Sequence, residues 1–337
     1  MNEPIPVAVI GTGHMGRHHV RIYHELPEAR LVGIVDPDVA RSGELAAKFN
    51  TQQYDTIEPL LGKVRAVSVA VPTVAHLAAS RPFLESGVAV LIEKPLAPDT
   101  QTARELLDLA HRHHTLLQVG HTERFNPVVR AMHRMQVAPQ FVETHRISPF
   151  TFRSADIGVV MDMMIHDIDI VLSLVRAKPA SVEAVGVNVI ARYEDIANAR
   201  VVFEGGCVAN LTASRLALKT ERKIRVFSPE AYLSLDYQKK AGIAIKKTAN
   251  LDLLKLLRER KAEDLSQLAG TDFGSLVKVE PLIVDDVEPL RAELQSFLHS
   301  VRTGEPPAVT AEDGAAAVDL AERITRTIRE HDWQIKT

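Results

Sequence analysis

One short stretch of this chain combines strong hydrophobicity with acid–base side chains. Residues Val159 to Leu174, VVMDMMIHDIDIVLSL, are apolar nearly all round, so we expect a buried helix. Asp162, His166 and Asp169 are spaced i, i+4 and i+7, which places them on one helix face. A carboxylate one turn before a histidine can orient the imidazole and raise its basicity. The spacing therefore predicts an oriented general base, His166, with Asp162 as its partner.

Two other interpretations of this stretch stay open. Buried ionisable groups cost free energy unless they are paired, so the same residues could form a structural cluster with Arg124 or Arg153. A metal site ranks last, because two carboxylates and one histidine on one face lack a convincing further ligand set. We place acid–base chemistry first and the structural cluster second, and we expect no metal.

A lysine follows another apolar run. Lys94 comes two residues after the predicted strand Val88–Ile92, between Glu93 and Pro95. A lysine held at the carboxyl end of a strand can point into a cofactor crevice and act as a base if its pKa is lowered. The competing interpretation is a surface loop lysine paired with Glu93.

The motif Gly-Thr-Gly-His-Met-Gly at residues 11–16 follows an apolar run and precedes an amphipathic segment, and Asp36 comes 20 positions after the last glycine. This spacing is the dinucleotide-binding fingerprint. Gly11 permits a tight turn, Gly13 lets a pyrophosphate approach, and Gly16 lets the helix pack against the strand. The N–H groups at the helix start then face the phosphates. Asp36 can accept both hydroxyls of an adenosine ribose and would repel a 2′-phosphate, which favours NAD over NADP.

The elements that position these residues alternate between strands and helices up to about residue 122. This alternation indicates right-handed crossovers and a parallel sheet covered on both faces, with ligands bound beyond the carboxyl ends of its strands. The segment Val71-Pro72-Thr73 ends one such strand. A histidine at the position of His76, in the first turn of the next helix, is more often a surface or capping residue than a functional one. The residues expected on the cofactor side are Gly11, Gly13, His14, Met15, Gly16, Asp36, Val71, Pro72, Thr73, His76, Glu93 and Lys94.

The second half has a different pattern. Several short strand-like segments are separated by turns such as Glu204-Gly205-Gly206, which predicts an open, antiparallel or mixed sheet. The charged stretch Lys239–Gly274 is ambiguous and is expected to be partly helical, and two helices end the chain. The predicted fold class is therefore α/β: a Rossmann doubly wound parallel sheet in residues 1–122, and an α+β domain with a large, mostly antiparallel sheet in residues 123–337. The last helix is expected to be able to pack back on the first domain.

Bulk properties exclude several classes of protein. The chain has 337 residues, enough for two domains, and its net charge of −3, with both signs interspersed, gives no indication of a nucleic-acid partner. The single cysteine, Cys207, cannot form an internal disulfide, which fits a reducing compartment. No apolar run is long enough to cross a bilayer, and the first strand begins too early for a signal peptide. We expect a cytoplasmic protein without a membrane partner.

We also expect self-association. An open sheet with one face on a site needs its other face covered, and this chain offers few helices to do so. Alternating apolar residues such as Val201 and Val208 could form part of that surface. The expectation is a homodimer or homotetramer.

Taken together, the glycine fingerprint, Glu93-Lys94-Pro95, the pair Asp162 and His166, and the open-sheet second half resemble the glucose–fructose oxidoreductase, inositol dehydrogenase and rhizopine-catabolism (Gfo/Idh/MocA) family over nearly the whole chain. In that family the lysine and histidine flank the sugar carbon that faces the nicotinamide. The resemblance implies NAD-dependent oxidation of a sugar hydroxyl, with Lys94, His166 and Asp162 as the catalytic residues. Either Lys94 or His166 could be the base.

Three segments resemble the branch that oxidises the 3-hydroxyl of UDP-N-acetylglucosamine: GHTERFNP at residues 120–127, SPFTFR at 148–153 and MIHDID at 164–169. In that branch the product is transaminated to a 3-amino sugar of some lipid A. The resemblance implies substrate binding by Arg124, Asn126, Arg153, Asp162 and His166. Arginine forks fit phosphate oxygens, so both arginines are candidates for the diphosphate, although either could be a structural ion pair.

Two departures from the family pattern keep alternatives open. The strand-end motif usually reads Thr-Pro-Asn, whereas this chain has Val71-Pro72-Thr73, and many members have glycine where Met164 stands. The alternatives are another sugar or inositol dehydrogenase of the family, an NAD-dependent glycosidase that oxidises carbon 3 transiently, and a non-catalytic NAD-binding sensor.

Overall fold

The N-terminal part of the chain forms a six-stranded sheet. The structure is a computed structural model that describes residues 3–151, 157–247 and 277–331. The strands pair in the order β3-β2-β1-β4-β5-β6, and every pair is parallel. The strands are β1 (Ile5–Ile10), β2 (Ala29–Val35), β3 (Gln52–Tyr54), β4 (Ala66–Val69), β5 (Ala89–Glu93) and β6 (Leu117–Gly120).

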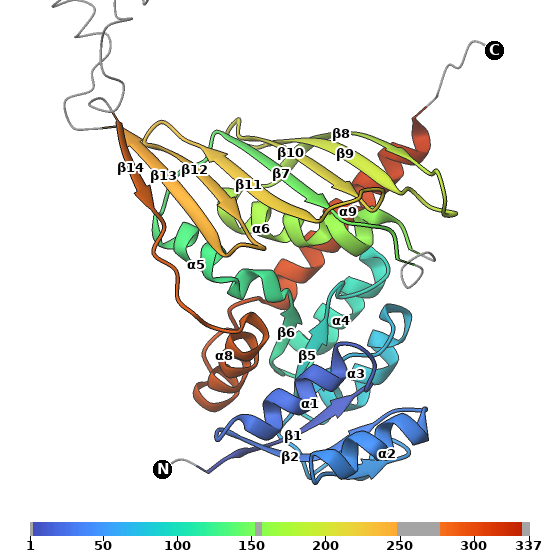
Figure 1. The fold of residues 1–337 in the computed structure, drawn as a ribbon. Coiled ribbons are helices and arrows are strands. Elements are labelled where there is room, and N and C mark those ends of the chain that lie inside the picture. Colours follow the sequence, from blue (N-terminus) through green and yellow to red (C-terminus); the bar gives the residue numbers. More distant parts are fainter. Residues whose placement is uncertain (1–2, 152–156, 248–276, 332–337) are drawn as a thin grey trace, which may run out of the picture.

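Helices cover both faces of this sheet (Figure 1). Successive strand residues point to opposite faces, so Val7 and Val9 join one hydrophobic cluster and Ala8 and Ile10 join the other. The first cluster includes buried residues of α1 and α8, and the second includes residues of α3 and α4. The helices are α1 (Gly16–Glu25), α2 (Val39–Lys48), α3 (His76–Glu85), α4 (Thr100–Arg112) and α8 (Pro289–Thr303), with short 3-10 turns η1 (Glu58–Leu60) and η2 (Thr73–Ala75).

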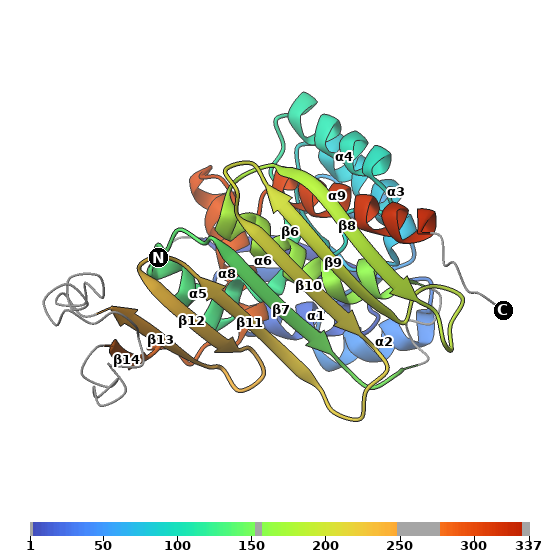
Figure 2. The ribbon, with the colours of Figure 1, turned by 90° about the horizontal axis from the view of Figure 1, so that it is seen from above.

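The C-terminal part forms an eight-stranded sheet in the order β14-β13-β12-β11-β7-β10-β9-β8. Only the β7–β10 pair is parallel, so the sheet is mixed and mostly antiparallel. The strands are β7 (Phe141–Ile147), β8 (Pro179–Val187), β9 (Ile196–Phe203), β10 (Val208–Ser214), β11 (Glu221–Phe227), β12 (Ala231–Asp236), β13 (Ala241–Lys247) and β14 (Val277–Pro281). Figure 2 shows that no described helix lies on its upper face.

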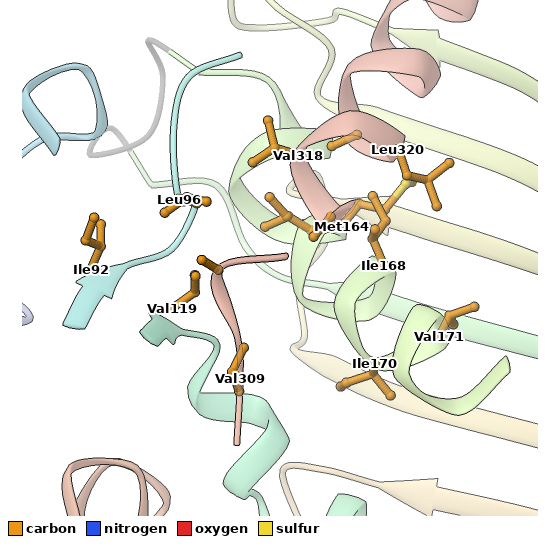
Figure 3. Packing of buried hydrophobic residues seen from close by; sticks show 14 of the residues in the cluster. Ile92, Leu96, Val119, Met164, Ile168, Ile170, Val171, Val309, Val318 and Leu320 are labelled. Carbon is orange, nitrogen blue, oxygen red and sulfur yellow. The ribbon is translucent and has the colours of Figure 1, made fainter. Parts of the chain in front are cut away.

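A layer of helices lies between the two sheets (Figure 1). It contains η3 (Thr122–Phe125), α5 (Pro127–Arg134), the π-helical turn η5 (Val160–Met164), α6 (Ile165–Val175) and α9 (Ala311–Glu330). Val119 of β6, Ile168 of α6 and Val318 of α9 belong to one buried cluster (Figure 3). A Cβ at Gly314 would lie 2.5 Å from a methyl group of Val119, so glycine is required where α9 crosses β6. This continuous core fixes α6 against the first sheet.

The predicted fold class is confirmed, but three local predictions differ. The stretch predicted as one helix begins with the π turn η5. Strand β13 occupies part of the stretch Lys239–Gly274, whose remainder from residue 248 lies outside the described residues. Val201 is fully buried on the inner face, opposite Ala209, whereas Val208 pairs with Val202, so Val201 and Val208 do not share a surface. Among the described residues, no helix is both long and apolar enough to cross a membrane.

Candidate active site

The glycine turn between β1 and α1 has the shape of a pyrophosphate cradle. Gly11 has a φ of 89°, and a Cβ there would lie 2.6 Å from the Ala70 carbonyl oxygen. A Cβ at Gly16 would lie 1.8 Å from the Gly11 oxygen, so only glycine allows this contact. Nothing lies within 4 Å of a Cβ at Gly13, which leaves its backbone open to a ligand. These positions fit a dinucleotide bound at the start of α1.

The two residues between these glycines begin the helix. Met15 is the N-cap of α1, and the His14 ring nitrogen Nδ1 lies 3.2 Å from Nη2 of Arg17. They therefore lie beside the glycine turn, and their contact with the cofactor stays a prediction.

Asp36 lies at the end of β2, next to the cradle. Its carboxylate accepts a 2.6 Å hydrogen bond from the Thr12 backbone N–H and a 2.7 Å ion-pair bond from Arg41. Burial alone would raise the pKa of Asp36, but hydrogen bonds from Thr12 and Asp38 hold that pKa below its usual value. The ionised carboxylate is thus fixed beside the glycine turn, and its contact with a ribose stays a prediction. Arg41, whose side chain is 50% exposed, was not singled out from the sequence.

His76 connects the loops that follow β4 and β5. Its Nε2 lies 3.1 Å from the carbonyl oxygen of Val71, and its Nδ1 lies 3.2 Å from that of Leu96. The side chain is 1% exposed, so the expectation of a surface or capping residue was wrong. Burial lowers the pKa of His76. Its contacts to both loops hold the turn that begins at Pro72 and Thr73 close to the loop that contains Lys94.

Glu93 and Lys94, at the end of β5, have different partners. Glu93 is buried, and its Oε1 lies 2.8 Å from Nε2 of the buried His19 of α1. The interpretation of Lys94 as a surface lysine paired with Glu93 was therefore wrong. The strand directs Glu93 toward α1 and Lys94 toward the helix layer, because neighbouring residues of a strand point in opposite directions.

Lys94 reaches Asp162 in the π turn. Its Nζ donates a 2.7 Å hydrogen bond to the Asp162 carbonyl and lies 3.5 Å from the carboxylate oxygen Oδ1. Burial lowers the pKa of Lys94, and the Asp162 charge opposes that shift without cancelling it. Within the described residues, Asp162 is bound by Lys94 and the His166 Nδ1 has no hydrogen-bond partner, so the predicted pairing of Asp162 with His166 is not formed.

His166 lies in the first turn of α6 with its Nδ1 buried and, within the described structure, without a hydrogen-bond partner. Burial, followed by the positive charges of Lys94 and Arg146, lowers the pKa of His166 well below its ordinary value. The imidazole is therefore neutral near pH 7 and able to accept a proton. Lys94 and His166 thus lie within electrostatic reach of each other, and Asp162 is bound to Lys94.

A buried network of ion pairs connects α6 to the large sheet. Arg146 of β7 donates two hydrogen bonds to Asp167, of 2.8 and 3.1 Å, and one of 3.1 Å to Glu123. Arg222 of β11 pairs in register with Arg146 and therefore points to the same inner face. Arg222 is 47% exposed, lies 3.6 Å from Glu123, and contributes to the lowered pKa of His166. Sequence reasoning missed Arg222, because strand pairing alone brings it near His166.

The residues expected to bind substrate are not all placed together. Arg124 forms a bidentate ion pair with the buried Asp169, with bonds of 2.7 and 2.8 Å, as in the structural-cluster interpretation. Asn126 is buried and caps α5 by accepting a hydrogen bond from the Val128 backbone N–H. Arg153 lies outside the described residues. The expectation that these three residues bind substrate is untested.

Another buried histidine lies near the site. His121 follows β6, is 1% exposed, and has both ring nitrogens buried without a hydrogen-bond partner among the described residues. Burial is the largest cause of its lowered pKa, and Asp169, Arg124 and Lys94 all act on its charge. His121 therefore lies within electrostatic reach of both Lys94 and the Arg124–Asp169 ion pair.

Comparison with known proteins places these features in context. Residues 5–121 match a family model described as "Oxidoreductase family, NAD-binding Rossmann fold", with the name GFO_IDH_MocA, and residues 128–234 match the GFO/IDH/MocA C-terminal domain. The chain is 38% identical over 230 residues to UDP-N-acetylglucosamine 3-dehydrogenase of Acidithiobacillus ferrooxidans, covering 68% of this chain and 73% of that protein. A solved structure of the enzyme of that name and organism has a TM-score of 0.87 and 31% identity, covering 97% of this chain and 98% of the other.

More distant relatives share the fold. Rhizopine catabolism protein MocA of Rhizobium meliloti is 24% identical over 336 residues, covering 96% of this chain and 94% of that protein. The structure of GenD2 from gentamicin A biosynthesis in complex with NAD has a TM-score of 0.78 and 22% identity, covering 98% of this chain and 95% of the other.

Proposed function

The chain belongs to the Gfo/Idh/MocA oxidoreductase family and is an NAD-dependent sugar dehydrogenase, and we propose that it oxidises the 3-hydroxyl of UDP-N-acetylglucosamine. One observation carries this proposal. Lys94, at the carboxyl end of β5, contacts Asp162 and lies within electrostatic reach of His166. The 38% identity to a UDP-N-acetylglucosamine 3-dehydrogenase supports the choice of substrate. The 3-keto product is the class of compound that a transaminase converts to a 3-amino sugar, as in some lipid A.

We propose that either Lys94 or His166 accepts the proton of the substrate hydroxyl. Both have a lowered pKa, so both can be neutral and able to take a proton from the substrate hydroxyl at a lower pH than an unperturbed lysine could. NAD supplies the hydride acceptor when it is bound along the glycine turn. Asp162 orients the Lys94 amino group, whose Nζ lies 2.7 Å from the Asp162 carbonyl oxygen and 3.5 Å from its carboxylate, so the group stays in place when it is neutral and able to accept a proton.

We assign the nucleotide diphosphate to Arg222. The Arg124 guanidinium already forms a bidentate pair with Asp169 through Nε and Nη2. Arg222 is on the same face of the sheet as Arg146, and about half of its side chain is exposed. The carboxylate of Glu123 lies 3.6 Å from Arg222 and is also bound by Arg146. A weakly engaged guanidinium beside His166 can bind phosphate oxygens with little rearrangement.

The direct test is NADH formation with purified protein and a panel of UDP-N-acetylglucosamine, UDP-glucose, free N-acetylglucosamine and myo-inositol. We expect net NADH and a 3-keto product with UDP-N-acetylglucosamine, with a kcat/KM at least about tenfold above that for any other compound, which corresponds to about 1.4 kcal/mol. Cleavage of a glycosidic bond without net NADH would identify a glycosidase instead. Binding of NAD with no turnover of any sugar would identify a sensor.

We also propose that the protein is a homodimer or homotetramer that associates through the upper face of the large sheet. That face carries Phe141, Phe227 and Tyr232 on three neighbouring strands. The ring centroids of Phe141 and Phe227 are 5.6 Å apart, and those of Phe227 and Tyr232 are 4.8 Å apart. Phe227 is 38% exposed. Apolar rings on an uncovered sheet face are typical of a protein–protein contact.

A further inference from the structure

A large hollow lies at the far end of α6 from His166. It has a volume of about 1110 Å³ and is bounded by η3, α5, the end of α6, α8 and the start of α9. Ser173 and Arg176 line it, and they lie roughly 10–15 Å along the helix axis from His166. None of the residues placed in the active site around Lys94 and His166 lines the hollow. Its basic lining residues are Arg124, Arg130, His133, Arg134, Arg176 and His299.

The hollow is also separate from the cofactor cradle. Arg124, on its wall, follows β6, which is the edge strand of the parallel sheet, whereas the glycine turn follows β1. Three strand spacings separate β1 from β6, which is roughly 14 Å. A ligand in the hollow therefore need not compete with NAD.

Some of the basic residues are neutralised. Arg124 is paired with Asp169, Arg134 lies 3.2 Å from Asp285, and His299 lies 3.0 Å from Glu305. Among the described residues, Arg130, His133 and Arg176 have no carboxylate partner. Asp313 is the one acidic residue of the described ranges that lines the hollow, and it lies 3.7 Å from Arg124.

Two guanidinium groups are left for a ligand. In the described part of the chain, Arg130 has no ion-pair partner, and Arg176 donates a 3.3 Å hydrogen bond only to the carbonyl of Ser173. Both side chains are exposed. Burial, followed by the charges of Arg124 and Arg176, lowers the pKa of His133, which also lines the hollow. The two guanidinium charges of Arg130 and Arg176 favour an anion of more than one charge.

We propose that this hollow is a second ligand site, which binds a small molecule carrying a diphosphate group. Planar guanidinium forks bind phosphate oxygens in pairs, so Arg130 and Arg176 can each hold one phosphate. Ser173 and Gln295 add polar side chains to the wall. The volume exceeds the need of a lone phosphate and is in the range of sites for whole metabolites.

The test is calorimetric titration of inorganic pyrophosphate into the full-length protein saturated with NAD, so that the glycine turn is filled. We expect saturable binding, weakened about tenfold in Arg130→Gln and about tenfold in Arg176→Asn, because each variant removes a charge-assisted contact, and tenfold corresponds to about 1.4 kcal/mol. Asparagine suits position 176, where φ is 53°. Arg104→Gln is the matched control, an exposed arginine in a depression that also contains Asp99 and Glu105.

Three results would overturn the proposal. One is the absence of pyrophosphate binding at millimolar concentration, and another is equal affinity in the two hollow variants and the Arg104→Gln control. The third is loss of binding in Arg222→Met with normal binding in Arg130→Gln, which would place the anion in the substrate cleft. Thermal melting of each variant verifies that it is folded. NADH formation from UDP-N-acetylglucosamine is measured separately, so failure here is distinguishable from failure of the proposed function.

Discussion

Lys94 and Asp162 are joined twice: the ammonium donates a 2.7 Å hydrogen bond to the Asp162 carbonyl and lies 3.5 Å from the Asp162 carboxylate. The first contact is made to the backbone of a π turn and the second to a side chain. Together they restrict the direction of the Lys94 side chain, which is 21% exposed. These two contacts therefore orient the Lys94 side chain, whereas His166 contributes a neutral imidazole beside it.

Lys94→Met and His166→Ala should each lose turnover while keeping NAD affinity. Neither side chain is part of the glycine turn, and loss of a proton acceptor typically lowers a rate by about 10²–10⁴. The measurements are NADH formation at saturating UDP-N-acetylglucosamine and fluorescence titration with NADH. Near wild-type turnover in both variants would place the chemistry elsewhere. Loss of activity together with loss of folding would favour a structural role for this cluster.

Asp162→Asn should shift the pH dependence of kcat/KM and lower the rate less than Lys94→Met does. Burial lowers the pKa of Lys94 and the Asp162 charge raises it, so removing that charge lets the pKa fall further. If neutral Lys94 is the base, the rising limb of the profile should then move to lower pH. A rising limb that stays in place would show that Lys94 does not set it, and would favour His166 as the base. His166→Ala is not informative here unless residual activity is measurable.

Asp36→Ser should narrow the preference for NAD over NADP. The substitution removes the ribose acceptor and the repulsion of a 2′-phosphate, and it also releases Arg41 from a 2.7 Å ion pair. Arg41 keeps its 3.1 Å ion pair with Asp38, but its other guanidinium nitrogen becomes available to a 2′-phosphate. Calorimetry with the two oxidised cofactors measures the change. Wild-type protein that binds NADP as tightly as NAD would refute the role given to Asp36.

The sequence predicts the cofactor cradle well because its determinants are local. Gly11, Gly13 and Gly16 lie within one turn, and each performs the steric role that its spacing indicates. Asp36 is fixed at the end of the next strand by the length of one strand–helix–strand unit. Lys94 is predictable for the same reason, since a strand's carboxyl end in a parallel sheet faces the ligand crevice.

The sequence predicts the partners of these residues poorly. The i, i+4 spacing of Asp162 and His166 does not reveal that Lys94, 68 residues earlier in the chain, binds Asp162 through both the carbonyl and the carboxylate. Arg222 reaches the site through the register of β11 with β7, which no local pattern encodes. Whether Arg124 binds a phosphate or pairs with Asp169 depends on how α6 packs against η3.

Phe227→Lys should shift the protein toward monomer if the upper face of the large sheet is an interface. A buried charge opposite an apolar partner costs several kcal/mol unless it is paired, which would outweigh the contact of one ring. Multi-angle light scattering at micromolar concentration measures the mass. Val74→Lys is the control, because Val74 is 81% exposed and lies in η2, away from that sheet. A monomeric wild-type protein would refute the proposed association.

Glu293→Gln should stabilise the protein increasingly as pH rises. Glu293 is 0% exposed; its Oε2 accepts a 2.8 Å hydrogen bond from Thr122, and its Oε1 has no partner among the described residues. Burial, and then the nearby charge of Glu93, raise the pKa of Glu293 well above its ordinary value. The folded chain thus holds a proton that the unfolded chain releases near pH 4.3, about the ordinary glutamate pKa.

The sign follows from linkage. A carboxyl whose folded pKa is raised contributes its full stability below the unfolded pKa, and that stability is lost as pH rises toward the folded pKa. Glutamine keeps the shape and has no charge to bury, so the melting temperature of Glu293→Gln should exceed that of the wild type by a margin that grows between about pH 5 and 9. Glu330→Gln, at an exposed helix end, removes the same charge as a control. A margin that is constant across this range, or that reverses at high pH, would show that Glu293 is ionised in the folded protein.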